Sequence, residues 1–77
     1  MTPTAFRTKN YRIVIYPKDH RPAHVHVIGP SAEAKFDIVT LECISSKGFS
    51  ERALRYIREY LFSRKERLLE IWDECQK

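Results

Sequence analysis

The last third of the chain restricts the possible folds more than any other segment, because its apolar residues recur at helical spacing and form one stripe on a helical wheel. The stripe consists of Leu54, Ile57, Leu61, Leu68, Trp72 and Cys75. Ser50 is a suitable N-cap, Glu51 favours the positive end of a helix, and Phe49 can pack against Leu54. The spacing predicts a helix over residues 51–75, whose stripe must be buried by the preceding part of the chain.

That preceding part contains three segments with the composition of β-strands. Residues 11–16 are β-branched and aromatic, and residues 24–28 and 33–38 alternate apolar and polar side chains. The alternation changes phase after the third segment, so a bulge, a strand end or a short fourth strand is expected within 39–44. The sequence therefore predicts one α+β domain over residues 1–77. Its fold would be β-β-β-α, a three-stranded antiparallel sheet, with room for a fourth strand, followed by one long C-terminal helix packed on one face.

The predicted helix is too long for the predicted sheet. As a single rod it would extend roughly 37 Å, whereas a six-residue strand spans about 20 Å. Either the helix breaks near residues 63–66, or its distal half packs on something other than its own sheet. We favour the second interpretation, in which a partner chain, such as a second copy in a homodimer, contacts Leu68, Leu69 and Trp72.

The charge distribution favours an anionic partner. The formal net charge is +4 at pH 7, and the excess of lysine and arginine lies in the first two thirds of the chain, whereas residues 68–77 are acidic. RNA, DNA or an acidic protein would be attracted to such a surface. The two cysteines, Cys43 and Cys75, have neither metal-binding nor disulfide-framework spacing. The longest apolar run, Ile13–Tyr16, is far too short to cross a membrane, so a cytoplasmic protein without a membrane partner is expected.

The three histidines lie close together, and strand alternation separates them. In the second predicted strand, Val25 and Val27 must share one face while His24 and His26 share the other. Because the helix needs an apolar sheet face, the valines are expected to point inward and these two histidines outward. His20 belongs to the preceding loop. The outward face is expected to carry Arg12, Tyr16, His24, His26, Glu33, Lys35 and Asp37.

Three interpretations of the histidines are open. The first is a solvated polar sheet face without a ligand. In the second, the chain cleaves RNA without any cofactor. His20, His24 and His26 would then remove the 2′-OH proton and protonate the leaving 5′-oxygen, and Lys35 or Arg12 would stabilise charge on the phosphate. The third, less favoured interpretation is a metal site. His24 and His26 would supply two imidazoles to one ion, and His20, Asp37 or Glu33 could complete the site.

Arginines supply the other candidate contacts with nucleic acid. Arg12 and Arg21 lie in or near the predicted strands, and Arg52 and Arg55 lie beside the helix stripe. A solvated helix face is the simpler explanation of Arg52 and Arg55. With two glycines in the chain, no glycine-rich phosphate loop is present.

Several blocks of the sequence resemble a small bacterial family described as a domain of unknown function. These blocks are PTAFR, YRIVIY, DHRPAHVHV, GP, AKF, GFS and LLEIW. The family has a D-H-x-P-P-H-V-H-V core, and Ala23 stands here in place of its second proline. An aromatic residue often follows AKF in the family, where this chain has Asp37, and this difference argues against a functional role for Asp37. Genes of the family resemble two-gene toxin–antitoxin cassettes, so the resemblance implies a toxin-like or regulatory role and a cognate protein partner encoded nearby.

The residues and the resemblance together predict a toxin–antitoxin-like module that acts on RNA through a histidine-bearing sheet face. The alternatives are a non-catalytic regulatory module that binds protein or nucleic acid, and a metal-binding site on the same histidines.

Overall fold

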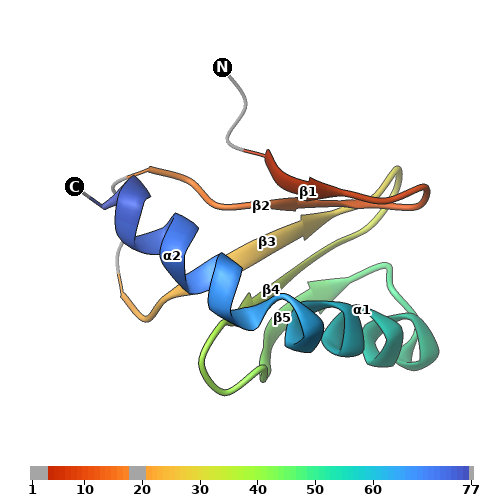
Figure 1. Cartoon of the computed structure of the whole chain (residues 1–77). Helices are drawn as coiled ribbons and strands as arrows, with labels where there is room; N and C mark the ends of the chain where they lie inside the picture. Colours follow the sequence, from red (N-terminus) through yellow and green to blue (C-terminus); the bar gives the residue numbers. More distant parts are fainter. Residues whose placement is uncertain (1–3, 18–20, 77) are drawn as a thin grey trace.

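The computed structural model of the chain describes residues 4–17 and 21–76. Within these ranges the chain forms five strands followed by two helices (Figure 1): β1 (Thr4–Arg7), β2 (Arg12–Val14), β3 (His24–Ile28), β4 (Glu33–Asp37), β5 (Cys43–Lys47), α1 (Glu51–Ser63) and α2 (Lys65–Cys75). The strands form one antiparallel sheet in the order β1-β2-β3-β4-β5, so each strand pairs with the next one along the chain.

The predicted α+β class is confirmed, but the predicted sheet of three or four strands is wrong, because the described residues form a sheet of five. The strands predicted over 11–16, 24–28 and 33–38 correspond to β2, β3 and β4. β1 was not predicted, since its four residues, TAFR, are too few to show alternation. β5 has the sequence CISSK, with one large apolar residue, and it lies at the sheet edge where no continuous apolar face is needed.

The single helix predicted over 51–75 is also wrong, because Arg64 separates α1 from α2. α1 begins as predicted, with the Ser50 side chain accepting a hydrogen bond from the Ala53 N–H at 3.1 Å. It ends where the Arg64 N–H donates to the Leu61 carbonyl at 3.1 Å, a bond between residues three apart that tightens the last turn. The break redirects the chain, so α2 also packs on the sheet instead of extending beyond it (Figure 1).

α2 contributes two buried residues to the core of its own chain. Leu68 is 1% exposed and Trp72 is 5% exposed, and Leu69 packs against the same core while remaining partly accessible. These three residues were the predicted contacts with a partner chain. The break at Arg64 removes the mismatch in length that suggested the partner. A homodimer through this helix stays a prediction.

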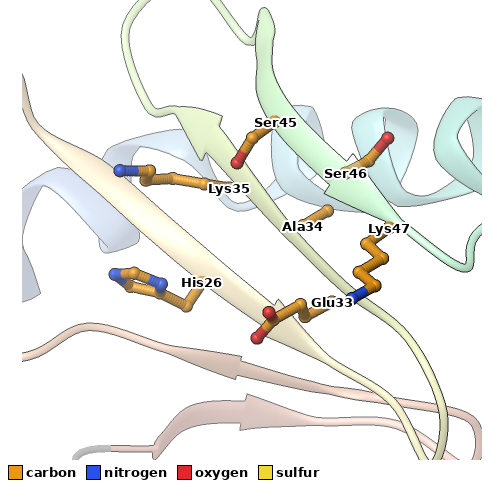
Figure 2. A pocket seen from close by; sticks show the side chains of 7 residues that line it. All are labelled: His26, Glu33, Ala34, Lys35, Ser45, Ser46 and Lys47. Carbon is orange, nitrogen blue, oxygen red and sulfur yellow. The ribbon is translucent and has the colours of Figure 1, made fainter.

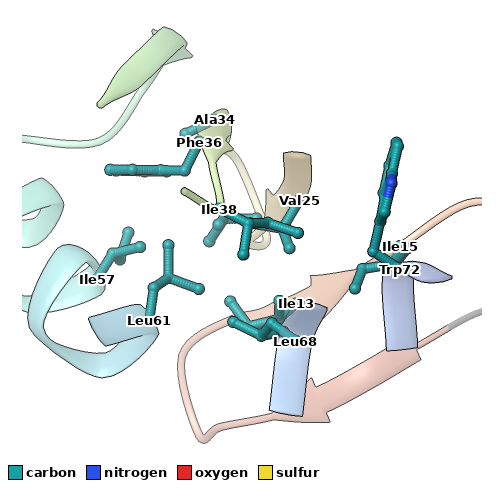
Figure 3. Packing of buried hydrophobic residues seen from close by; sticks show 11 residues of the cluster. Ile13, Ile15, Val25, Ala34, Phe36, Ile38, Ile57, Leu61, Leu68 and Trp72 are labelled. Carbon is teal, nitrogen blue, oxygen red and sulfur yellow. The ribbon is translucent and has the colours of Figure 1, made fainter. Parts of the chain in front are cut away.

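The core lies between one face of the sheet and the two helices (Figure 3). The strands, the residue after β2 and the turn after β4 contribute Ile13, Ile15, Val25, Val27, Ala34, Phe36 and Ile38. The helices contribute Ile57, Leu61, Leu68 and Trp72. The inward orientation predicted for the two valines of β3 is therefore confirmed. Burial of each large apolar side chain stabilises the fold by about 1.5–3 kcal/mol, so this layer is the main source of folding energy.

The turn between β4 and β5 uses the carboxylate of Asp37. Its Oδ1 atom accepts hydrogen bonds from the N–H groups of Val39 at 2.7 Å and Thr40 at 2.9 Å. The Asp37 carbonyl accepts another from the N–H of Leu41, which has a positive φ of 64°. The change of phase expected within 39–44 is thus the end of β4 and the beginning of β5. Asp37 acts in this turn as a structural residue.

Candidate functional site

The face of the sheet that points away from the helices, called here the outer face, carries its side chains in rows across the strands. One row contains successive cross-strand partners Val14, His26, Lys35 and Ser45. The next row contains Arg12, Ile28, Glu33 and Lys47. Directly opposed residues on antiparallel strands have Cβ atoms about 4.5–5.5 Å apart. The sheet register therefore places His26 and Lys35 side by side.

A hollow of about 410 Å³ opens on the outer face beside this pair. It is lined by His26, Glu33, Ala34, Lys35, Ser45, Ser46 and Lys47, and is called here the His26 hollow. Figure 2 shows the side chains of His26 and Lys35 next to each other in front of the sheet, with both helices behind it. The hollow combines an imidazole, two ammonium groups and the Ser45 hydroxyl with a single carboxylate, which is a suitable lining for a phosphate-bearing ligand.

The His26 ring contacts two other rings and is half-buried. The Tyr16 ring contacts it edge-on, with centroids 4.8 Å apart and an interplanar angle of 73°. The His24 ring also contacts it edge-on, at 5.2 Å and 68°. Tyr16 is 40% exposed, so the Tyr16–His26 pair presents an accessible aromatic surface. Such rings can stack with unpaired bases.

His24 was predicted to be exposed on the outward face, but only 3% of its surface is accessible. Its Nδ1 atom lies 2.7 Å from the carbonyl oxygen of Pro22. A carbonyl can only accept, so Nδ1 carries the proton, and in the neutral ring the lone pair is on Nε2. The ring also packs against Trp72 at 5.3 Å between centroids. His24 therefore packs against the His26 ring, and too little of its side chain is exposed to contact a polynucleotide on the outer face.

The other predicted site residues are divided between two sides of the molecule. Arg12 lies on the outer face with His26 and Lys35, while Arg21 is exposed in the loop before β3. Arg52 and Arg55 are exposed on α1, which covers the opposite face. The Arg52 guanidinium lies 5.9 Å from the centre of the Tyr56 ring. His20, the third predicted acid–base residue, lies outside the described residues.

Several residues of the outer face were missed from the sequence. Lys47 and Ser45 lie in β5, and Arg7 lies in β1, so their positions became visible only once these strands were known. Lys47 immediately precedes Gly48, and the sequence suggested that it belongs to the segment leading into the helix. The only sequence signal for β5 was the change of phase after β4. The charge of the outer face was therefore underestimated.

No group of three or more histidine, cysteine, aspartate or glutamate side chains capable of holding a metal occurs among residues 4–17 and 21–76. Two of the three histidines considered as metal ligands, His24 and His26, lie with their ring centroids 5.2 Å apart. His20 belongs to the segment outside these ranges, so the three-histidine metal site stays a prediction. Asp37, a candidate carboxylate for that site, is already bonded within the turn after β4.

A cluster of aromatic rings lies on the helix side of β1 and β2. Tyr60 contacts Phe6 and Tyr11 edge-on at 6.3 and 6.0 Å, and the Arg64 guanidinium lies 3.8 Å from the centre of the Tyr60 ring. Burial raises the pKa of the Tyr11 hydroxyl above 10.0, Tyr60 raises it further, and Arg64 acts in the opposite direction. Arg64, the residue between the two helices, therefore packs against this cluster.

These features define a small α+β domain with an antiparallel five-stranded sheet and a polar, histidine-bearing outer face. The chain belongs to the family described as Domain of unknown function (DUF4160), whose model matches residues 10–73. The resemblance noted from the sequence is thereby confirmed at the level of the family, while β1 precedes the matched region. No curated protein and no solved structure matches the chain. No helix among the described residues is long and apolar enough to cross a membrane.

Proposed function

We propose that this domain is a toxin–antitoxin-like module that acts on RNA, and that the outer face around His26 is where the RNA strand binds. The observation that carries the proposal is the position of His26 in the His26 hollow, beside Lys35 and within contact of an exposed tyrosine ring. Proteins bind single-stranded RNA through a positively charged surface with rings on which bases stack. The outer face combines both features.

The charges of the outer face fit this ligand. The row that contains His26 also contains Lys35, and the next row contains Arg12 and Lys47. Glu33 is the one carboxylate among the described residues of these two rows. The formal net charge of +4 at pH 7 favours attraction of a polyanion from a distance. Each ammonium or guanidinium group that contacts a phosphate releases bound counterions, so RNA affinity would fall steeply with salt.

His26 and Lys35 also fit a cleavage step. His26 would take the proton from a 2′-hydroxyl group as the 2′-oxygen attacks phosphorus. The bond from phosphorus to the 5′-oxygen then breaks, a 2′,3′-cyclic phosphate forms, and the leaving oxygen takes a proton from water. Lys35 would stabilise the negative charge on the phosphate oxygens. His24, held by Pro22 and Trp72, would fix the orientation of the His26 ring.

The burial of His24 favours a second candidate function, a non-catalytic RNA-binding or protein-binding regulator. Cleavage of this type is fastest when two groups divide the acid and base roles. Among the described histidines, His26 is the one with substantial access to a ligand on the outer face, because His24 is 3% exposed. A cognate partner protein encoded nearby, as the resemblance implies, would then regulate access to the same face.

The proposal is tested with labelled single-stranded RNA. Affinity is measured for the wild type, for His26→Ala and Lys35→Ala, and for Arg55→Ala, which removes one exposed cation from α1 on the other side of the molecule. Loss of a base-stacking ring costs about 1–3 kcal/mol, or roughly 5- to 150-fold in affinity. We expect His26→Ala to lose RNA affinity in this range. Lys35→Ala should lose RNA affinity, and its affinity should depend less steeply on salt. Arg55→Ala should retain both.

The same samples separate the two candidate functions. Accumulation of a 2′,3′-cyclic phosphate product with the wild type, but not with His26→Ala, would support cleavage. Binding without any product would support the non-catalytic module. If the wild type binds no RNA, or if Arg55→Ala weakens binding as much as His26→Ala, the outer face is not the RNA surface.

A further inference from the structure

A second hollow, of about 340 Å³, lies at the end of the sheet where β1 turns into β2. It is called here the turn hollow and is lined by Arg7, Thr8, Lys9, Asn10, Tyr11, Arg12, Ile28, Gly29 and Pro30. Arg7 and Arg12 are direct cross-strand partners on β1 and β2. Thr8 shapes the turn, since its side chain accepts hydrogen bonds from the N–H groups of Asn10 at 3.2 Å and Tyr11 at 3.1 Å.

The charges of the turn hollow are unbalanced. Two arginines are direct cross-strand partners and one lysine lies in the turn, while none of the described residues that line the hollow is acidic. Like charges placed directly opposite each other destabilise a sheet. A bound anion would remove this repulsion, and the planar donors of arginine match the oxygens of a phosphate.

Shared lining residues connect the turn hollow to the His26 hollow. A third hollow, of about 270 Å³, lies between them. It shares Ile28, Gly29 and Pro30 with the turn hollow, and Glu33 and Lys47 with the His26 hollow. The path from Arg7 on β1 to Lys35 on β4, which lines the His26 hollow, crosses three strand spacings, or about 14 Å. This length is suited to an oligonucleotide and exceeds the reach of a single phosphate.

We infer that the turn hollow is a phosphate subsite for the same RNA strand, and that the strand runs from Arg7 and Arg12, past Gly29 and Pro30, to His26 and Lys35 in the His26 hollow. The inference rests on the proposed RNA-binding function and adds a second anchoring point and a path to it. An acidic peptide carries the same sign of charge but has planar carboxylates in place of the tetrahedral phosphate groups spaced along an RNA backbone. The aromatic pair at the far end of the path favours RNA.

The test compares two double variants that remove the same charge. Arg7→Gln with Lys9→Gln removes two exposed cations of the turn hollow, and Arg52→Gln with Arg55→Gln removes two exposed cations of α1. All four side chains are exposed, so melting temperature should be retained, and this is checked first. Affinity is measured for labelled oligouridylates of about four and about twelve nucleotides, over a range of salt concentrations.

For the longer oligouridylate, the turn-hollow variant should bind at least about tenfold more weakly than the wild type, and its salt slope should decrease by about 1.4, since each phosphate contact on a single strand contributes about 0.7. The shorter oligouridylate, held by the His26 hollow, should lose much less affinity. The α1 variant should retain the wild-type slope.

An unchanged slope in the turn-hollow variant, an equal loss for both lengths, or an equal loss in the α1 variant would overturn the subsite. Displacement of the longer oligouridylate by a polyglutamate peptide of equal charge, as effectively as by unlabelled oligouridylate, would overturn the choice of RNA. If the wild type binds neither oligouridylate, the proposed function fails as well. If the wild type binds and only His26→Ala and Lys35→Ala lose affinity, the proposed function stands and the subsite alone is refuted.

Discussion

Replacement of His24 by alanine should destabilise the domain strongly, whereas replacement of its neighbour His26 should not. The two histidines are two positions apart on β3, so strand alternation predicts the same orientation for both side chains. In the structure His24 is 3% exposed, donates to the Pro22 carbonyl over 2.7 Å and packs on Trp72 at 5.3 Å. His26 is half-buried on the outer face.

The size of the effect follows from these contacts. Loss of the hydrogen bond to Pro22 costs about 1 kcal/mol, and loss of the ring contact with Trp72 costs about 0.5–1.5 kcal/mol. The space left against the Trp72 ring adds to the cost. His24→Ala should therefore lose about 2–3 kcal/mol, which lowers Tm by roughly 10–20 °C in a domain of this size. His26→Ala should lose about 0.5–1 kcal/mol, mainly from its contact with Tyr16.

The assay is thermal unfolding followed by circular dichroism, with His24→Asn as the matched control. An asparagine amide can donate to the Pro22 carbonyl, so this variant should recover about 1 kcal/mol relative to alanine, while the ring contact stays lost. Equal melting temperatures for His24→Ala and His26→Ala would refute the division between a supporting and an accessible histidine. A larger loss at His26 would refute it more strongly.

Three further predictions concern stability. Gly48→Ala should lose more than about 2 kcal/mol, because φ is +92° and the added Cβ would lie 2.7 Å from the Ser31 carbonyl oxygen; a melting temperature equal to that of the wild type would contradict this geometry. Ser50→Ala should lose about 1 kcal/mol with the α1 N-cap, and Ser50→Asp should restore it, both measured by urea unfolding. The raised pKa of Tyr11 means that the folded state holds this proton more tightly than the unfolded state. The corresponding stability is present below pH 10.0 and lost as pH rises through the pKa of the folded state, so the urea midpoint should fall between about pH 9 and about pH 12 in the wild type and less so in Tyr11→Phe.

The strands with alternating or β-branched sequences were predictable because a half-buried sheet requires that pattern. β3 is the clearest case, since Val25 and Val27 are both 0% exposed. β1 and β5 carry too few apolar residues to be recognised without their neighbours. The break at Arg64 was one of two interpretations of an overlong helix, and the less favoured one proved correct. Its cause, the packing of the guanidinium on Tyr60 and the tightened last turn, depends on tertiary contacts.

The candidate site was predictable in part. Alternation placed His26 and Lys35 on one face, and the sheet register brings them together. Alternation could not show that Trp72 packs against His24, because that contact depends on the direction of α2 after the break. The turn hollow was invisible from the sequence, since Arg7 and Arg12 become neighbours only through the pairing of β1 with β2.

The most direct test of the outer face as an RNA surface is an NMR titration of the isotopically labelled domain with an oligouridylate. The proposal predicts that resonance changes concentrate on His26, Lys35 and Lys47, and extend to Arg7 and Arg12 with the longer oligouridylate. Resonances of Arg52 and Arg55 should change little. Changes confined to α1 and α2, or no changes at RNA concentrations well above that of the protein, would contradict the proposal.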